Sequence, residues 1–118
     1  MRPVRNDDDD LMRELRTEMT LLDRAVREIR PRGKAKADTE RAYRVALAKY
    51  IATKRAEGMA VTTLGDMARG DPEIARLRLE RDLADVIYSS NQEAINVQKL
   101  KLRLLDAQIA REWHVNGN

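Results

Sequence analysis

The stretch from Pro72 to about Trp113 contains no glycine and no further proline, and this uninterrupted run restricts the fold more than any other feature. Asp71 supplies a side chain that can cap a helix, Pro72 suits the first helical position, and Glu73 places an acid in the first turn. We therefore predict a single helix that is roughly 60 Å long, at a rise of about 1.5 Å per residue.

The apolar residues of this predicted helix form two stripes. The first stripe consists of Leu79, Leu83, Val86, Val97, Leu100 and Leu104. The second consists of Ile87, Tyr88, Ile95, Leu102, Leu105, Ile109 and Trp113. Two stripes imply two buried faces, which shorter helices of the same chain can cover only with difficulty. We therefore predict a helical bundle that is completed by homo-oligomerisation.

Asn91 and Asn96 interrupt these apolar faces. A polar residue within an apolar helix face can set the register and the copy number of a helical assembly. The alternative is that both asparagines are simply exposed.

Residues 11–30 carry a second signal, the a/d pattern of a coiled-coil seam. Its apolar positions, spaced alternately by three and four, are Met12, Leu15, Met19, Leu22, Val26 and Ile29. One helix cannot bury such a stripe alone, so another segment of the chain or a second copy must cover it. We place the predicted oligomer interface on these six residues together with Leu102, Leu105 and Ile109.

Breaker residues set the other predicted boundaries. Residues 31–33 (Pro-Arg-Gly) predict the end of the first helix. A second helix is expected from about Asp38 or Thr39 to Gly58. A short helical turn over residues 64–69 follows, capped by Thr62 or Thr63. Val61, Leu64 and Met67 are expected to pack this turn onto the core.

The predicted organisation therefore has three parts. They are a disordered acidic N-terminus at residues 1–10, a coiled-coil-like arm and hinge at residues 11–33, and a helical core domain at residues 34–118. The composition agrees with an all-α fold: the chain has no Phe, one Trp and three Tyr, so its apolar volume comes from aliphatic side chains.

The sequence lacks the residues that several classes of function require. There is no cysteine, the single histidine (His114) stands near the C-terminus, and none of the five glycines forms a phosphate-binding GxxxxGK[ST] loop. The longest apolar runs are far short of the roughly 18 residues that span a bilayer, and no apolar signal-peptide core follows Met1. We expect a soluble cytoplasmic protein that is not an enzyme, does not engage a membrane and needs no metal or other cofactor.

The positive charge is concentrated in one segment. Between Arg24 and Arg55 stand eleven Lys or Arg and three acids, although the net charge of the whole chain is only +3. Such a segment either binds a polyanion or presents solvated helix faces. The candidate phosphate ligands are Arg30, Arg32, Lys34, Lys36, Arg41, Arg44, Lys49, Lys54 and Arg55.

Two tyrosines accompany these cations. Tyr43 and Tyr50 are seven residues apart and so share a helix face. Aromatic rings beside cations can stack the bases of a single strand, but tyrosines at helical spacing are more often core residues. Backbone electrostatics, which confers no sequence specificity, is the better-supported mechanism.

The chain resembles small helical proteins in the replication and recombination modules of tailed bacteriophages. The resemblance covers more than half of the chain and rests on residues 42–47 (AYRVAL), 55–58 (RAEG), 61–62 (VT), 68–71 (ARGD), 93–96 (EAIN), 101–105 (KLRLL) and 111–113 (REW). It implies an oligomeric recombination mediator, acting in an infected bacterium, that helps a recombinase or annealing protein load on single-stranded DNA. Residues 1–40 take no part in it.

We thus expect a non-catalytic, oligomeric helical protein that binds single-stranded nucleic acid non-specifically. The alternative is a protein-interaction module for virion assembly, chaperoning or inhibition of a host protein, with no role in nucleic-acid binding. Its surfaces would be the seam of residues 11–30 and whichever apolar stripe of the long helix faces outward.

Overall fold

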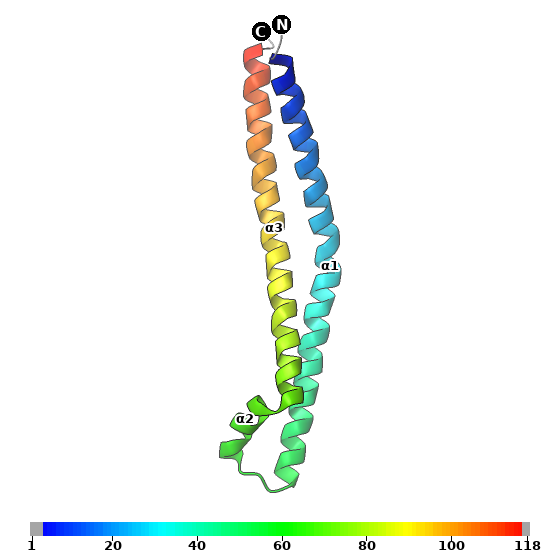
Figure 1. Ribbon diagram of the computed structural model, residues 1–118, viewed down its shortest axis with the longest axis vertical. Helices are drawn as coiled ribbons and strands as arrows, with labels where there is room; N and C mark the ends of the chain where they lie inside the picture. The colour runs from blue at the N-terminus through cyan, green and yellow to red at the C-terminus, as the bar shows by residue number, and fades with distance from the viewer. Residues whose placement is uncertain (1–3, 117–118) are drawn as a thin grey trace. The chain divides into compact units, whose positions relative to one another are not determined.

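The computed structural model describes the backbone of residues 4–116 and the side chains of residues 9–114. Within these residues the chain forms three helices and no strand: α1 (Val4–Ala56), α2 (Val61–Gly70) and α3 (Pro72–Asn116). The predicted all-α class is confirmed, and so is the long last helix (Figure 1).

The contacts divide the chain into two units. Unit 1 consists of Met1–Ile29 and Ser90–Asn118, and unit 2 of Arg30–Ser89. In each unit a segment of α1 and a segment of α3 lie side by side and run in opposite directions (Figure 1). Contacts therefore group the start of α1 with the end of α3, a different division from the predicted arm and core.

The predicted helix break at residues 31–33 is wrong, because α1 continues through Pro31. An internal proline costs a helix about 3 kcal/mol. Contacts within unit 2 stabilise the helix just beyond it. The Tyr88 ring lies against Gly33, where an added Cβ would be 3.1 Å from Tyr88 Cε1. Lys36 Nζ lies 3.2 Å from the Asp85 carboxylate and 5.1 Å from the centre of the Tyr88 ring.

The start of the chain also differs from the prediction. Residues 4–10 belong to α1 rather than to a disordered tail, whereas residues 1–3 lie outside the described part of the chain. Among the described side chains, Asp10 pairs with Arg13 over 3.4 Å at a spacing of three residues, which supports the helix at this point.

The two helices of unit 1 meet along a seam with coiled-coil spacing. Its buried or half-buried positions in α1 are Leu11, Leu15, Glu18, Leu22, Ala25 and Ile29. Those in α3 are Asn91, Ile95, Gln98, Leu102, Leu105 and Ile109. The steps alternate between three and four residues, as in helices that pack side by side. This seam is only partly apolar, because Glu18 Oε2 and Gln98 Oε1 are buried without a hydrogen-bond partner among the described residues.

Asn91 is the polar residue that this seam buries. It is 2% exposed, and its Nδ2 donates to the carbonyl oxygen of Ala25 over 2.8 Å. Asn96 is exposed. Asn91 therefore occupies the buried seam position that the register-setting hypothesis requires, whereas Asn96 is a surface residue.

Unit 2 has the same kind of seam with α2 packed beside it. In α3 the seam positions are Ile74, Leu77, Arg81, Ala84 and Tyr88, and in α1 they include Tyr43, Ala46, Leu47 and Tyr50. Leu64 and Ala68 of α2 are buried. Leu64 thus packs as predicted, whereas Val61 and Met67 are 62% and 52% exposed.

A glycine ends α1. Gly58 has φ of 95°, its N–H donates to the carbonyl of Arg55, and the N–H of Met59 donates to the carbonyl of Lys54. These two bonds form a Schellman motif, which a left-handed glycine favours. The predicted threonine cap of α2 is wrong, because the N-cap is Ala60 and the Thr63 hydroxyl donates to the Ala60 carbonyl.

The start of α3 follows the sequence prediction. Asp71 Oδ2 accepts a hydrogen bond of 3.1 Å from the backbone N–H of Ile74, and Pro72 is the first helical residue. In the first turn, the hydrogen bond that Arg76 donates to Glu73 lowers the pKa of that carboxyl.

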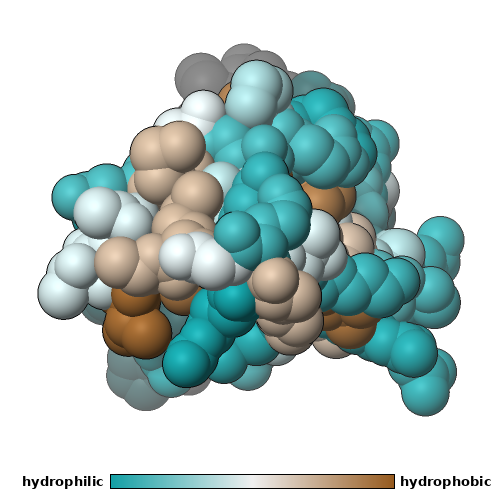
Figure 2. All heavy atoms as spheres, turned by 90° about the horizontal axis from the view of Figure 1, so that it is seen from below, coloured by the Kyte–Doolittle hydropathy of each residue, from teal (hydrophilic) through white to brown (hydrophobic). Residues whose placement is uncertain are grey.

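The two stripes of α3 have different environments. In the second stripe, Leu105 is buried and Tyr88, Ile95, Leu102 and Ile109 are half-buried, but Ile87 and Trp113 are exposed. Every residue of the first stripe is exposed. In the end-on view of Figure 2, hydrophobic patches stand between hydrophilic residues. No helix within the described residues has the length and apolar character needed to cross a membrane.

Candidate nucleic-acid interface

Helix α1 presents a row of cations in unit 2. Arg30, Arg41 and Arg55 are separated by 11 and 14 residues, which correspond to about three and four turns, and so share one face. Lys34 and Arg44 lie on the same face, seven residues before Arg41 and 11 before Arg55. We call these five exposed residues the basic face.

The basic face points away from α3. Arg41 is two residues from the seam residue Tyr43, and two residues correspond to a rotation of about 200° around a helix. The positions between the cations on this face are the exposed alanines Ala37, Ala48 and Ala52. Their short side chains leave the helix surface open to close approach by a phosphate backbone.

The other predicted phosphate ligands lie off this face. Lys54 is half-buried, 3.5 Å from Glu57, and Lys36 contacts Asp85. Arg32 is half-buried and already has an interaction partner. Lys49 is exposed to one side of the row. The structure therefore brings together five of the nine predicted ligands.

Acidic neighbours neutralise two of the five. The Lys34 ammonium donates a hydrogen bond to Asp38, which raises the pKa of Lys34. Arg44 Nε donates to Glu40 over 2.8 Å. Among the described residues, no carboxylate pairs with the three arginines of the row, Arg30, Arg41 and Arg55. These three are the strongest candidates to contact phosphate.

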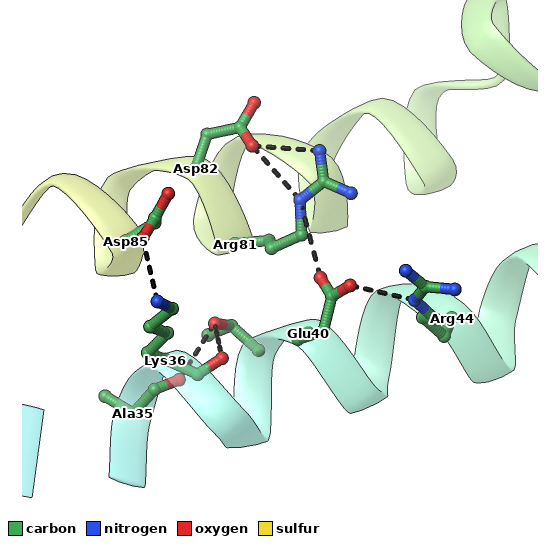
Figure 3. A network of polar contacts seen from close by, with 8 residues as sticks. Ala35, Lys36, Glu40, Arg44, Arg81, Asp82 and Asp85 are labelled. Carbon is green, nitrogen blue, oxygen red and sulfur yellow. Dashed lines mark hydrogen bonds and ion pairs between the residues drawn. The ribbon is translucent and has the colours of Figure 1, made fainter. Parts of the chain in front are cut away.

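A charge network fixes the side of α1 that faces α3. Glu40 lies between Arg44 and Arg81, with Arg81 Nε 3.6 Å from Glu40 Oε2 (Figure 3). Arg81 also donates to Asp82, which raises the pKa of its guanidinium, and its Cζ lies 4.4 Å from the centre of the Tyr43 ring. Arg81 is therefore committed to packing within unit 2.

The two tyrosines lie in the seam and not on the basic face. Arg81 covers the Tyr43 ring, while Tyr50 is half-buried with Lys54 Nζ 5.7 Å from its ring centre. This placement agrees with the interpretation as core residues, and base stacking loses its main support. Phosphate electrostatics is the mechanism that the geometry favours.

Unit 2 also contains a pocket of about 250 Å³. Its lining is Tyr43, Leu47, Ile51, Leu64, Gly65, Ala68, Arg69, Ile74, Ala75 and Arg78. This lining has no carboxylate and no imidazole, and its ionisable side chains are Tyr43, Arg69 and Arg78. No group of three or more potential metal ligands occurs in the described part of the chain.

Most residues of the predicted oligomer interface pack inside unit 1. Leu105 is buried, and Leu15, Leu22, Ile29, Leu102 and Ile109 are half-buried. The remaining three, Met12, Met19 and Val26, are 41%, 53% and 49% exposed. The larger exposed apolar surface is the first stripe of α3, to which the sequence alone could not assign a partner.

No protein-family model matches this chain, and neither a curated protein nor a solved structure matches it. A function for the chain therefore has to come from its own residues and their geometry.

Proposed function

We propose that the chain is a non-catalytic protein that binds the phosphate backbone of nucleic acid on the basic face of α1, without reading the bases. The observation that carries the proposal is the alignment of Arg30, Arg41 and Arg55 on one exposed face without acidic partners in the described structure. Guanidinium groups suit phosphate because they stay charged and present several donors.

The arrangement favours binding along a strand over recognition of a single group. Along the helix axis, Arg30 and Arg41 are about 16 Å apart and Arg41 and Arg55 about 21 Å apart. Contacts at these intervals can engage several phosphates of one strand. Because the alanines between them cannot form hydrogen bonds to base edges, such binding is insensitive to sequence.

Single-stranded DNA is the ligand that we propose, in line with the resemblance to phage recombination proteins. In that role the protein would help a recombinase or annealing protein load on the strand. The supporting features are the all-helical architecture and the cationic face.

The test compares two triple variants with the same loss of charge. R30Q/R41Q/R55Q removes the unpaired cations of the basic face, and R24Q/R78Q/R111Q removes three exposed arginines that lie off that face. We expect the first variant to bind single-stranded oligonucleotides of different sequence more weakly and to a similar extent. Its dependence of log affinity on log salt should flatten by about 2, at about 0.7 per lost phosphate contact. Fluorescence anisotropy over a salt series measures both quantities.

The control variant should keep most of the wild-type affinity. Equal losses in the two variants would mean that net charge, and not the basic face, attracts the strand. Wild-type protein that fails to bind any oligonucleotide at low ionic strength would contradict the proposal itself.

One observation favours the alternative, a protein-interaction module. The first stripe of α3 leaves six large apolar side chains exposed, which is a typical helix-in-groove surface. Under this alternative, oligonucleotides would not bind while a protein partner copurifies through α3.

A further inference from the structure

The first stripe of α3, which we now call the outer stripe, is an unusually regular apolar surface. Its residues are 40% to 61% exposed and comprise Leu79, Leu83, Val86, Val97, Leu100 and Leu104. Leu79 is two residues from the seam positions Leu77 and Arg81, so it points to the opposite side of the helix. The outer stripe therefore lies away from α1 and nothing in the described structure covers it.

The outer stripe reads the same in both directions along the helix. From Leu79 to Leu104 the steps are 4, 3, 4, 3, 4, 3 and 4 residues, with Ser90 and Glu93 in the two central positions. The six apolar residues are also mirrored, because the order is Leu, Leu, Val, Ser, Glu, Val, Leu, Leu, and only the central pair, Ser90 and Glu93, differs. A stripe with this symmetry brings apolar residues opposite one another when it pairs antiparallel with a copy of itself around a two-fold axis.

We propose that two copies of this chain associate through an antiparallel pairing of their outer stripes. The two-fold axis passes between Ser90 and Glu93. Leu79 then packs opposite Leu104 of the second copy, Leu83 opposite Leu100, and Val86 opposite Val97. Each layer pairs an a position with a d position, as antiparallel coiled coils do.

The residues that flank the outer stripe are complementary in the same register. Glu80 lies opposite Lys101 of the second copy, and Asp82 opposite Arg103. All four side chains are exposed. The uncharged flanks match as well: Ile87 faces Ala94, and Ser89 faces Asn96. The two-fold axis repeats every pair, so the dimer has four ion pairs between copies.

A parallel pairing lacks these features. It would place Glu93 beside Glu93 of the second copy, and it would pair Asp82 with Ile87 and Arg103 with Gln108 across the flanks. The charge pattern therefore selects the antiparallel arrangement.

The flanking charges are available for these contacts. Glu80 is 2.7 Å from Arg76, and Asp82 is 2.9 Å from Arg81, but the acids in both pairs are about half exposed. Exposed local pairs contribute little and can be shared or exchanged at small cost. In unit 2 the basic face of α1 points away from α3, so pairing through α3 leaves it open.

Charge reversal tests the register. Sedimentation should give the wild-type protein a mass of twice 13.6 kDa at micromolar concentration. K101E alone, or E80K alone, turns two attractive contacts into repulsive ones and should raise the dimer dissociation constant by on the order of tenfold or more. The double variant E80K/K101E restores opposite charges and should return it to within about threefold of wild type.

Two comparisons control this experiment. K99E makes the same charge change on α3 at a position off the flanks and should leave dimerisation unchanged. Lys101 also lines a shallow groove with Glu14 and Glu18 of its own chain. Recovery in E80K/K101E separates the effect between copies from that local one, since the double variant lacks Lys101 too.

Single cysteines test the direction of pairing, because the chain has none of its own. Under mild oxidation, chains with L83C and chains with L100C should cross-link when mixed, and neither should cross-link alone. Position 83 of the two copies is about 17 residues, or roughly 25 Å, apart in the antiparallel dimer, which no disulfide spans.

Three results would overturn this proposal: a wild-type monomer at tens of micromolar, no response to K101E, or cross-linking of L83C chains on their own. None of them bears on nucleic-acid binding. Conversely, R30Q/R41Q/R55Q should remain a dimer whether or not it binds DNA.

Discussion

Asn91 is a polar side chain buried between the two helices of unit 1. It occupies a seam position of unit 1 that an aliphatic residue would fill in a coiled coil, and it donates a hydrogen bond to the Ala25 carbonyl. We expect this amide to favour the observed register, because a one-turn slip would place the larger Leu22 or Ile29 of the seam opposite it in place of Ala25.

Replacing Asn91 should lower the free energy of unfolding by about as much as the loss of one buried hydrogen bond. N91A removes the bond to Ala25 and leaves a small cavity, so the free energy of unfolding should fall by about 1–3 kcal/mol. N96A, at the exposed asparagine, should change it by less than about 0.5 kcal/mol. Urea unfolding at one protein concentration compares the two. Equal effects would show that Asn91 is not held in the seam.

The sequence identified both asparagines as interruptions of apolar faces but could not rank them. Which one is buried depends on the rotation of α3 relative to α1 within unit 1, and that rotation is set by tertiary packing along the seam, which a local sequence pattern does not contain. The same limit applies to Tyr43 and Tyr50, whose spacing was clear while their surroundings were not.

At the scale of elements, α3 was predictable and the continuity of α1 was not. Asp71, Pro72 and Glu73 form a local start signal, and no breaker follows, so local chemistry alone determines α3. At Pro31 the local signal favours a break, but contacts with α3 around Gly33 and Lys36 stabilise the continuous helix. Such contacts join residues about 50 positions apart and are invisible in a local pattern.

Pro31 should therefore be a destabilising residue that the fold tolerates. P31A restores the N–H that can bond the carbonyl of Arg27 and removes the clash of the proline ring. We expect the free energy of unfolding to rise by about 2–3 kcal/mol. The matched control is P72A, at the first position of α3, where proline is compatible with the helix and the change should stay below about 1 kcal/mol.

Thermal and urea unfolding measure both proline variants. A P31A protein that is less stable than wild type would contradict this account, because it would mean that α1 needs the altered geometry of a proline at this point.

At the scale of the whole chain, the two long helices each have an outward face of different chemistry. In unit 2, α1 presents the basic face on the side away from α3. Helix α3 presents the outer stripe on the side away from α1. The sequence predicted both the cationic segment and the two apolar stripes. It could not tell which stripe the chain covers itself, because both stripes are apolar and only the pairing with α1 distinguishes them.

These two faces would give the proposed dimer a simple functional consequence. Each copy would contribute one basic face, so a dimer would have two phosphate-binding surfaces linked through α3. Linked sites raise apparent affinity without any new contact, provided that one strand can reach both.

The most direct test is the mass of the wild-type protein in solution, measured by sedimentation with and without a short single-stranded oligonucleotide. The account predicts a dimer that gains the mass of bound oligonucleotide and does not dissociate. A monomer whose mass the oligonucleotide leaves unchanged at low ionic strength would contradict it.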